Sequence, residues 1–171
     1  MNNIIAGQDN GNGIHYVEYD PPVNLANSGS GPSIINLDMD NDEVDDFELE
    51  YLYQNSYRSH PSWSEQLTIK PLGMNSICVS KENGGLVDSL RLNDTISSKS
   101  NWSGITAVLY RHWIDGAGGN PTFIVYTNGF WYQPQRKYYI GVKIVNGDHD
   151  FFGWIYIGYR SIDRFAVTTP Y

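Results

Sequence analysis

The chain has 171 residues, the length of one domain that can bury a sizeable core without disulfide bonds. Its 11 basic and 19 acidic residues give a net charge of −8, and the basic residues form no patch or stripe, which argues against a nucleic-acid-binding protein. No apolar run approaches the length of a membrane span, and the single cysteine, Cys78, is expected to be a small buried side chain rather than half of a disulfide.

The composition favours an all-β fold. The 17 Gly and 8 Pro are spread among short apolar runs, as in proteins built from short strands and many turns. Residues 1–13 are rich in Asn and Gly, and we expect them to be a flexible, loosely attached segment. From residue 14 to residue 171 we expect a single antiparallel β-sandwich of jelly-roll-like architecture.

Short apolar or alternating runs predict the strands. In the first half we expect strands at residues 14–20, 34–37, 47–53, 66–70 and 76–80. In the second half we expect strands at residues 105–113, 123–126, 130–132, 138–145, 148–159 and 162–168. The first strand is expected to end at Pro21-Pro22, because proline cannot donate to a sheet ladder.

The strands at 138–145 and 148–159 form the clearest predicted hairpin. Asn146-Gly147 between two apolar runs is a preferred type I′ turn, because both central residues of that turn need a positive φ. This turn would pair Val145 with Asp148, and therefore Gly141 with Phe152. One face of the hairpin is aliphatic and is expected to be core; the other carries Tyr139, Phe152, Trp154 and Tyr156.

The stretch from Leu37 to Tyr53 carries the strongest chemical signal. Of the 19 acidic residues, eight lie between Asp38 and Glu50. Four of them occupy positions 1, 3, 5 and 9 of a nine-residue loop: Asp38, Asp40, Asp42 and Asp46. Carboxylates that alternate along a tight loop can converge on a hard cation such as Ca²⁺, and Val44 at position 7 would add a backbone carbonyl. The spacing therefore predicts a calcium loop; the alternative is an acidic, solvated turn with no metal.

This loop is not an EF-hand. Leu49 stands at the twelfth position, where an EF-hand has a bidentate Glu, and Glu43 stands at the sixth, where it has a Gly. The residues that follow also predict no helix, because Phe47, Leu49 and Tyr51 alternate with acidic residues at the period of a half-buried strand.

Two motifs resemble known families. The D-x-D-x-D-x-x-x-D loop running into a strand resembles the calcium loops of integrin propellers and thrombospondin type 3 repeats. The segment from Leu37 to Phe47 resembles the D-x-D-x-D-G-x-x-D-F segment of small bacterial secreted or surface β-sandwich proteins, with Glu43 in place of the Gly. The segment from Tyr139 to Ile155 resembles their late Y-h-G-h-K … Y-G-W hairpin. The resemblance covers residues 14–168 and implies an extracellular, calcium-stabilised sandwich whose role is largely uncharacterised.

Other functions have weaker support. A crowded loop of Asp residues suits a cation better than the two separated carboxylates of a glycosidase, so a hydrolase ranks third. No zinc-binding His spacing, serine elbow or phosphate loop occurs, and we expect no enzyme. The alternative function is a carbohydrate-binding module whose sugar would stack on Tyr139, Phe152, Trp154 and Tyr156; against it, a hairpin that is apolar on both faces is normally covered on both. We therefore expect a secreted or cell-surface binding or adhesive domain, with a glycan or surface protein as partner.

Overall fold

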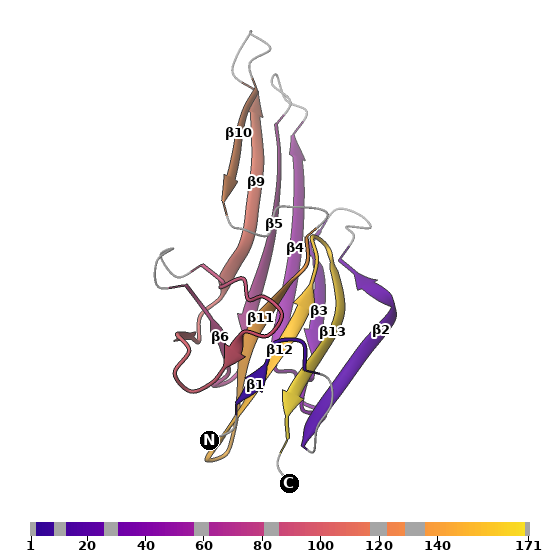
Figure 1. Cartoon of the computed structure of the whole chain (residues 1–171). Helices are drawn as coiled ribbons and strands as arrows, with labels where there is room; N and C mark the ends of the chain where they lie inside the picture. The colour runs from indigo at the N-terminus through magenta and orange to yellow at the C-terminus, as the bar shows by residue number, and fades with distance from the viewer. Residues whose placement is uncertain are drawn as a thin grey trace.

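The computed structural model describes residues 3–8, 13–25, 31–56, 62–80, 86–116, 123–128 and 136–169. These residues form antiparallel β-sheets without any helix, and two of the sheets pack face to face (Figure 1). The predicted all-β sandwich is therefore confirmed. It shares the two packed sheets of a jelly roll. Of the twelve pairs of consecutive strands among the described residues, five are neighbours within one sheet, and the other connections cross between sheets.

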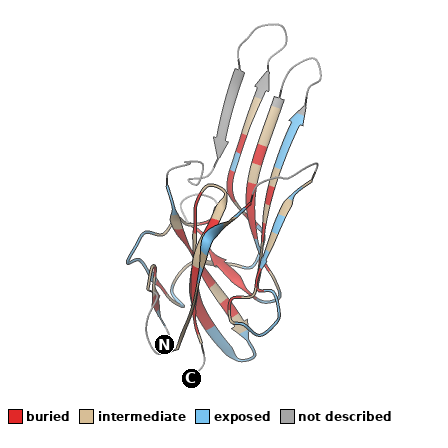
Figure 2. Cartoon of the chain, turned by 90° about the vertical axis from the view of Figure 1, so that its right-hand side faces the viewer, coloured by how far each residue is buried: buried red, intermediate tan, exposed pale blue. Residues whose placement is uncertain are grey.

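The first sheet has five strands. In spatial order they are β10 (Phe123–Asn128), β9 (Ala107–Gly116), β5 (Ser62–Pro71), β4 (Phe47–Ser56) and β3 (Ser33–Leu37). The outer halves of β4, β5, β9 and β10 extend beyond the end of the other sheet (Figures 1 and 2). The strands predicted at 34–37, 47–53, 105–113 and 123–126 thus exist, and a strand predicted at 130–132 lies outside the described residues.

The second sheet has six strands. In spatial order they are β2 (Ile14–Asn24), β13 (Ser161–Thr168), β12 (His149–Ile157), β11 (Tyr138–Asn146), β6 (Ser76–Cys78) and β8 (Trp102–Ser103). β2 continues through Pro21-Pro22, where the sequence predicted its end. Because β2 is an edge strand and its pairing with β13 is interrupted between Ile162 and Arg164, the missing proline donors cost no ladder bond.

The main core lies between these two sheets. Alternate residues of β4, β5 and β9 face alternate residues of β11, β12 and β13, and the side chains that meet there are almost entirely buried. They include Phe47, Leu49, Leu67, Ile69, Leu109, Ile140, Val142, Ile144, Ile155 and Phe165. The aliphatic face of the predicted hairpin is part of this core, as expected.

The hairpin of β11 and β12 has a different register from the predicted one. Asn146 pairs with His149, so the two loop residues are Gly147 and Asp148, and Gly141 pairs with Trp154 rather than with Phe152. Gly147 has a φ of 62° and Asn146 has no positive φ, which is the pattern of a type II′ turn with Gly at its first central position. The shift is two residues along the partner strand, so every side chain keeps its predicted face.

A second apolar cluster covers the outer face of the six-stranded sheet, the face turned away from the main core. Tyr139, Phe152 and Trp154 lie on this face and are 5%, 4% and 0% exposed. They pack against Ile4 and Ala6 from the N-terminal segment and against Ile96. The aromatic face of the hairpin is thus covered, as the two-sided apolar pattern predicts.

Residues 3–8, part of the segment that was expected to be flexible, pack against the sandwich. Ile4–Ile5 forms strand β1, which pairs with β7 (Thr95–Ile96), and Ile4 is fully buried. We expected residues 1–13 to be loosely attached because Asn and Gly dominate them. Within residues 3–8, the short apolar run Ile4-Ile5-Ala6 decides the outcome, because it caps aromatic side chains that would otherwise face water.

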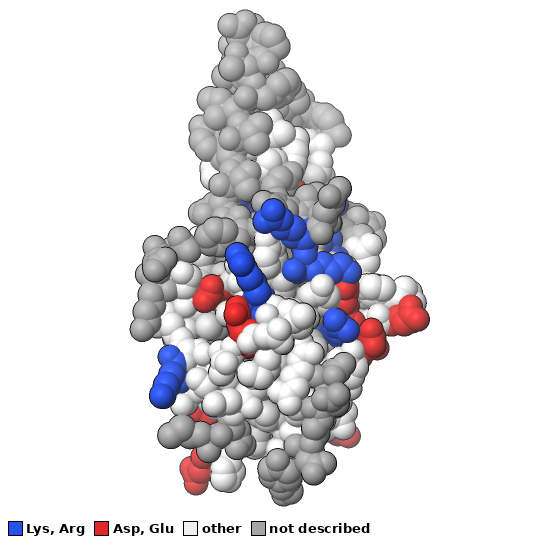
Figure 3. Space-filling view, viewed as in Figure 1, with Lys and Arg blue, Asp and Glu red and all other residues white. Residues whose placement is uncertain are grey.

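Charged side chains occupy the part of the outer face that this cluster leaves open (Figure 3). Lys137 pairs with Asp163, and Arg164 lies 4.0 Å from Glu18. Basic and acidic groups therefore lie next to each other there.

Among the described residues, no helix has the length and hydropathy needed to cross a membrane.

Candidate metal centre

The acidic loop, residues 38–46, connects β3 to β4 in the five-stranded sheet. Leu37, the last residue of β3, pairs with Phe47, the first residue of β4, and both side chains are buried in the main core. The Asp46 N–H also donates to the Leu37 carbonyl at 2.7 Å. The two ends of the loop are thus held together by the sheet, and the nine residues between them must form a compact excursion.

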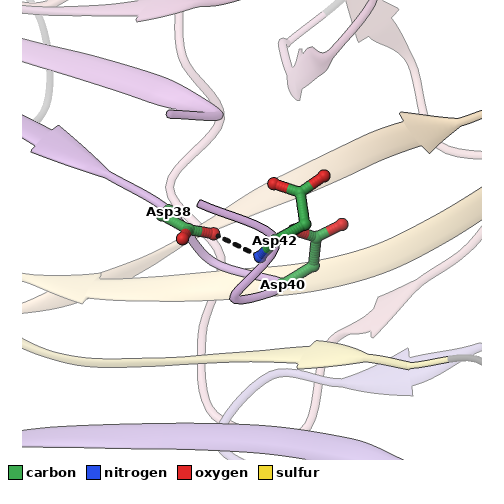
Figure 4. Close-up of side chains that lie close together, drawn as sticks. All are labelled: Asp38, Asp40 and Asp42. Atoms are coloured by element: carbon green, nitrogen blue, oxygen red, sulfur yellow. Dashed lines mark hydrogen bonds between the residues drawn. The ribbon is translucent and has the colours of Figure 1, made fainter. Parts of the chain in front are cut away.

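Asp38 organises the start of this excursion. Its Oδ1 accepts hydrogen bonds from the N–H groups of Asn41 (2.8 Å) and Asp42 (3.2 Å), and its Oδ2 accepts one from Glu43 (2.9 Å). Figure 4 shows Asp38 directed at the backbone of Asp42 across the turn. A carboxylate that accepts three backbone hydrogen bonds curls the chain around itself, so Asp38 shapes the loop whether or not an ion is bound.

The curl needs two residues in the left-handed region. Asn41 has a φ of 62° and Glu43 has a φ of 69°. Asn tolerates this conformation, whereas Glu pays the usual steric cost of an L-residue with a side chain. The sixth position of an EF-hand loop carries Gly for the same reason, and Glu43 adopts the left-handed conformation at a cost in stability.

Three of the predicted ligands come together. One carboxylate oxygen from each of Asp38, Asp40 and Asp42 lies within 4.8 Å of the others (Figure 4). Two oxygens on opposite sides of one Ca²⁺ are separated by up to about 5 Å, twice the metal–oxygen distance, so these separations are compatible with a single shared ion. These residues could therefore hold a metal ion.

Asp40 is the least satisfied of the three clustered carboxylates. Its Oδ1 is buried and has no hydrogen-bond partner among the described residues. Burial raises the pKa of Asp40, and the neighbouring charges of Asp42 and Asp38 raise it further, while hydrogen bonds from the Asn146 side chain and from the Asp42 backbone lower it. A buried carboxylate oxygen without a donor is costly, and a cation among the three carboxylates would remove that cost.

Asp46 lies beneath the other three carboxylates. It is 5% exposed, and its oxygens accept hydrogen bonds from the Met39 N–H (2.8 Å) and from Asn75 Nδ2 (2.9 Å). Burial raises its pKa to about 6, opposed by the Met39 hydrogen bond and reinforced by the charge of Asp40. The hydrogen bonds of Asp46 with Met39 and Asn75 hold the end of the loop in place. Asp46 is not one of the three clustered carboxylates, so its role as a direct ligand stays a prediction.

Val44, the predicted carbonyl ligand, lies on the open side of the loop. Its side chain is 63% exposed, and its N–H donates to Asp42 Oδ1 at 2.9 Å. This hydrogen bond fixes the orientation of the Asp42 carboxylate. The Val44 carbonyl as a ligand likewise stays a prediction.

Sequence reasoning missed two residues beside the loop. Asn146, at the end of β11, places its Nδ2 3.5 Å from both Asp40 Oδ2 and Asp42 Oδ2. Asn75 connects Asp46 to the same hairpin by accepting the Val145 N–H at 2.9 Å. Neither contact has a local signal, because the residues that meet are between 29 and 106 positions apart in the sequence.

A second polar cluster, centred on Glu65 in β5, was also not predicted. Glu65 is 1% exposed and accepts hydrogen bonds from the hydroxyls of Tyr51 and Tyr159 and from the Arg160 guanidinium. The Arg160 guanidinium carbon lies 4.9 Å from the Tyr51 ring centroid and 4.6 Å from that of Tyr159. In this part of the chain the sequence predicts strands only at residues 47–53 and 66–70, because polar residues dominate the stretch between them; in the structure β5 begins at Ser62 and includes Glu65.

Comparison with known proteins gives no further guide. The chain matches no protein family, no curated protein and no solved structure. The resemblance of its two motifs to bacterial surface proteins therefore stays a prediction.

Proposed function

We propose that this protein is a secreted or cell-surface binding or adhesive domain whose fold is stabilised by one calcium ion in the acidic loop. The observation that carries the metal site is the cluster of Asp38, Asp40 and Asp42 around a buried, unpartnered oxygen of Asp40. Three carboxylates supply only part of a calcium coordination shell. Backbone carbonyls, such as that of Val44, and water would complete it.

Calcium is favoured over other ions by the type of ligand. All three clustered side chains are carboxylates, which suit hard cations, and no Cys or His from the described part of the chain joins them. Mg²⁺ requires near-ideal octahedral geometry and gives up its water reluctantly, so an irregular nine-residue loop suits Ca²⁺ better. Because loops with few protein ligands bind calcium weakly, this site favours a location outside the cytosol, where calcium is abundant.

Thermal unfolding in EGTA and in millimolar calcium tests the proposal. Binding to the folded state alone stabilises it by about 2.7 kcal/mol at a hundredfold excess over Kd. For a chain of this length we expect the melting temperature to rise by roughly 5–10 °C, and by less with Mg²⁺. Equal melting temperatures for the wild-type chain in EGTA and calcium would show that the loop is only a solvated turn.

Two aspartate variants provide a matched pair for this measurement. Asp42→Ala removes one of the clustered carboxylates and should abolish most of the calcium response. Asp45→Ala removes the same charge from the same loop, but Asp45 pairs with Asn36 at 2.7 Å and is not in the cluster. Its calcium response should be close to that of the wild type. If both variants respond alike, the effect comes from net charge and not from coordination.

The burial of Tyr139, Phe152 and Trp154 is evidence against the carbohydrate-binding alternative, in which a sugar would stack on these side chains. Trp154 is fully buried, and its Nε1 donates to the Gln8 carbonyl at 3.1 Å, so no sugar can stack on it in this structure. Trp154→Ala should therefore destabilise the fold by about 3–5 kcal/mol, as measured by urea unfolding. A variant as stable as the wild type that loses retention on a glycan array would restore the carbohydrate-binding function.

A further inference from the structure

The acidic loop and the β11–β12 turn belong to different sheets, and two asparagines, Asn146 and Asn75, connect them. Asn146 closes β11 in the six-stranded sheet, and its Nδ2 lies 3.5 Å from one oxygen of Asp40 and 3.5 Å from one oxygen of Asp42. Both distances are at the long limit for an N–H···O hydrogen bond, which is normally about 2.9 Å. The amide thus sits between two carboxylates without forming a close bond to either.

The backbone beside Asn146 is held in this position by independent contacts. Asn75 accepts the N–H of Val145 at 2.9 Å and donates to Asp46 Oδ1 at 2.9 Å. Its Nδ2 also lies 3.3 Å from the Asp46 carbonyl. Asn75 therefore holds the end of the hairpin against Asp46, at the end of the acidic loop. The position of Asn146 opposite Asp40 and Asp42 is thus set by the contacts of Asn75 and does not depend on the long hydrogen bonds of Asn146 itself.

An amide side chain can serve either charge state of this loop. When the carboxylates are not neutralised, the NH₂ group facing them is favourable. When a cation lies among them, the same NH₂ group would face a positive charge. Rotation of the amide exchanges its nitrogen for its oxygen at nearly the same position, and Asn carbonyl oxygens are common calcium ligands.

We propose that Asn146 is a ligand of the ion held by Asp38, Asp40 and Asp42, through its side-chain oxygen, so that the bound ion ties the two sheets together. This inference rests on the proposed metal site. Two observations support it: the buried Oδ1 of Asp40 has no donor among the described residues, and Asn146 comes from the other sheet to lie against that same carboxylate. A calcium ion seated there would stabilise the packing of the sheets as well as the loop.

Calcium titration of the metal-free protein by calorimetry tests the role of Asn146. Asn146→Ala removes the amide from an exposed position, so the variant is expected to fold, and its calcium affinity should fall by about tenfold or more. Asn146→Asp keeps an oxygen at the ligand position and should bind calcium at least as tightly as the wild type.

Asn36→Asp is the control for charge. Asn36 contacts Asp45 at 2.7 Å, at the edge of the same loop, so this variant adds the same negative charge without supplying a ligand to the cluster. Its affinity should change by less than about threefold, because charge attraction through water is screened.

The outcomes separate this inference from the proposed function. A wild-type chain that binds no calcium would overturn both. A wild-type chain that binds calcium, with Asn146→Ala equally tight, would leave the metal site standing and overturn the role of Asn146. If Asn146→Asp weakens binding as much as Asn146→Ala, the amide acts only as an N–H donor, and the role as a ligand is likewise overturned.

Amide hydrogen exchange gives a second readout. In the wild type, calcium should slow exchange at residues 145–149 of the β11–β12 hairpin as well as in the acidic loop, because the ion connects the two. In Asn146→Ala, the slowing should be confined to the acidic loop. Equal slowing at the hairpin in both proteins would show that the ion does not act through Asn146.

Discussion

Acidic side chains lie near both ends of strand β12, but they differ in the hydrogen-bond donors and positive charges around them. Near its start, the β11–β12 turn meets the acidic loop, where three carboxylates are clustered and one buried oxygen has no donor. Beyond its other end, Tyr159 and Arg160 meet Glu65, whose carboxylate accepts hydrogen bonds from two tyrosines and a guanidinium. Both places link the five-stranded sheet to the six-stranded one.

The difference lies in what neutralises the acidic groups. Burying a carboxylate is costly unless donors or a positive charge replace its water, and at Glu65 the protein supplies these from its own side chains. At the acidic loop it supplies mainly backbone N–H groups and amides, and the buried Oδ1 of Asp40 is left without a donor among the described residues. A buried carboxylate that the protein's own donors neutralise indicates a structural clamp, whereas the cluster of Asp38, Asp40 and Asp42 could hold a metal ion.

Removing Glu65 should give the largest effect. Glu65→Leu leaves the Tyr51 hydroxyl and the Arg160 guanidinium without their acceptor and should destabilise the protein by about 3–4 kcal/mol in urea unfolding. The calcium-induced rise in melting temperature should persist, because the acidic loop is at the other end of the sandwich. Glu48→Ala, which breaks the exposed pair with Lys70, is the control and should cost less than about 1 kcal/mol.

Alkaline pH should lower the free energy of unfolding through the tyrosines near Glu65, by a somewhat smaller amount than the loss of Glu65. Burial and the nearby Glu65 raise the pKa of Tyr51 and of Tyr110, both almost fully buried. Below about pH 10 the tyrosines are neutral in both states and the stability is intact; above it the unfolded chain ionises first, and stability is lost. By pH 11 we expect a loss of about 1.4 kcal/mol for each of these tyrosines.

Unfolding curves at pH 9 and pH 11 measure this loss, and Tyr110→Phe should reduce it. Since the tyrosines lie away from the acidic loop, the loss should be the same in EGTA and in calcium. A loss that appears only in EGTA would place the alkaline transition at the acidic loop instead.

Asp40→Asn should reverse its effect with the metal. In EGTA the variant removes a buried charge that neighbouring carboxylates repel, and it should be more stable than the wild type by about 1 kcal/mol. In calcium it lacks a charged ligand and should be less stable. Thermal melts of the two proteins in both buffers check the reversal, and a variant that is less stable in both would show that the carboxylate is not strained without metal.

Glu43→Gly should give the smallest effect. A side chain at a φ of 69° costs about 1–2 kcal/mol, and glycine costs about 0.5–1 kcal/mol in backbone entropy, so the net gain should be about 0.5–1 kcal/mol. Asn41→Gly, at a φ of 62°, is the matched control and should gain less because Asn tolerates this region. Denaturant unfolding of both variants decides whether the loop is strained at Glu43.

The sequence determined the features that depend on neighbours along the chain. Alternating side chains located most strands of both sheets, because the period of two in a strand is local. The spacing of Asp38, Asp40 and Asp42 placed three carboxylates on one side of a tight loop for the same reason. The alternation along the β11–β12 hairpin also placed Trp154 and the aliphatic residues on opposite faces. The two turn residues, Gly147 and Asp148, lie one position later in the chain than the predicted Asn146 and Gly147.

Only the tertiary structure decided which distant segments meet. Asn146 reaches Asp40 across 106 positions, and Arg160 reaches Glu65 across 95, so neither contact leaves a pattern in the sequence. The same holds for Ile4, whose burial depends on aromatic side chains more than a hundred residues away. Local spacing specifies which groups a loop or strand presents, whereas the packing of two sheets determines whether those groups meet a partner, a covering segment or an ion.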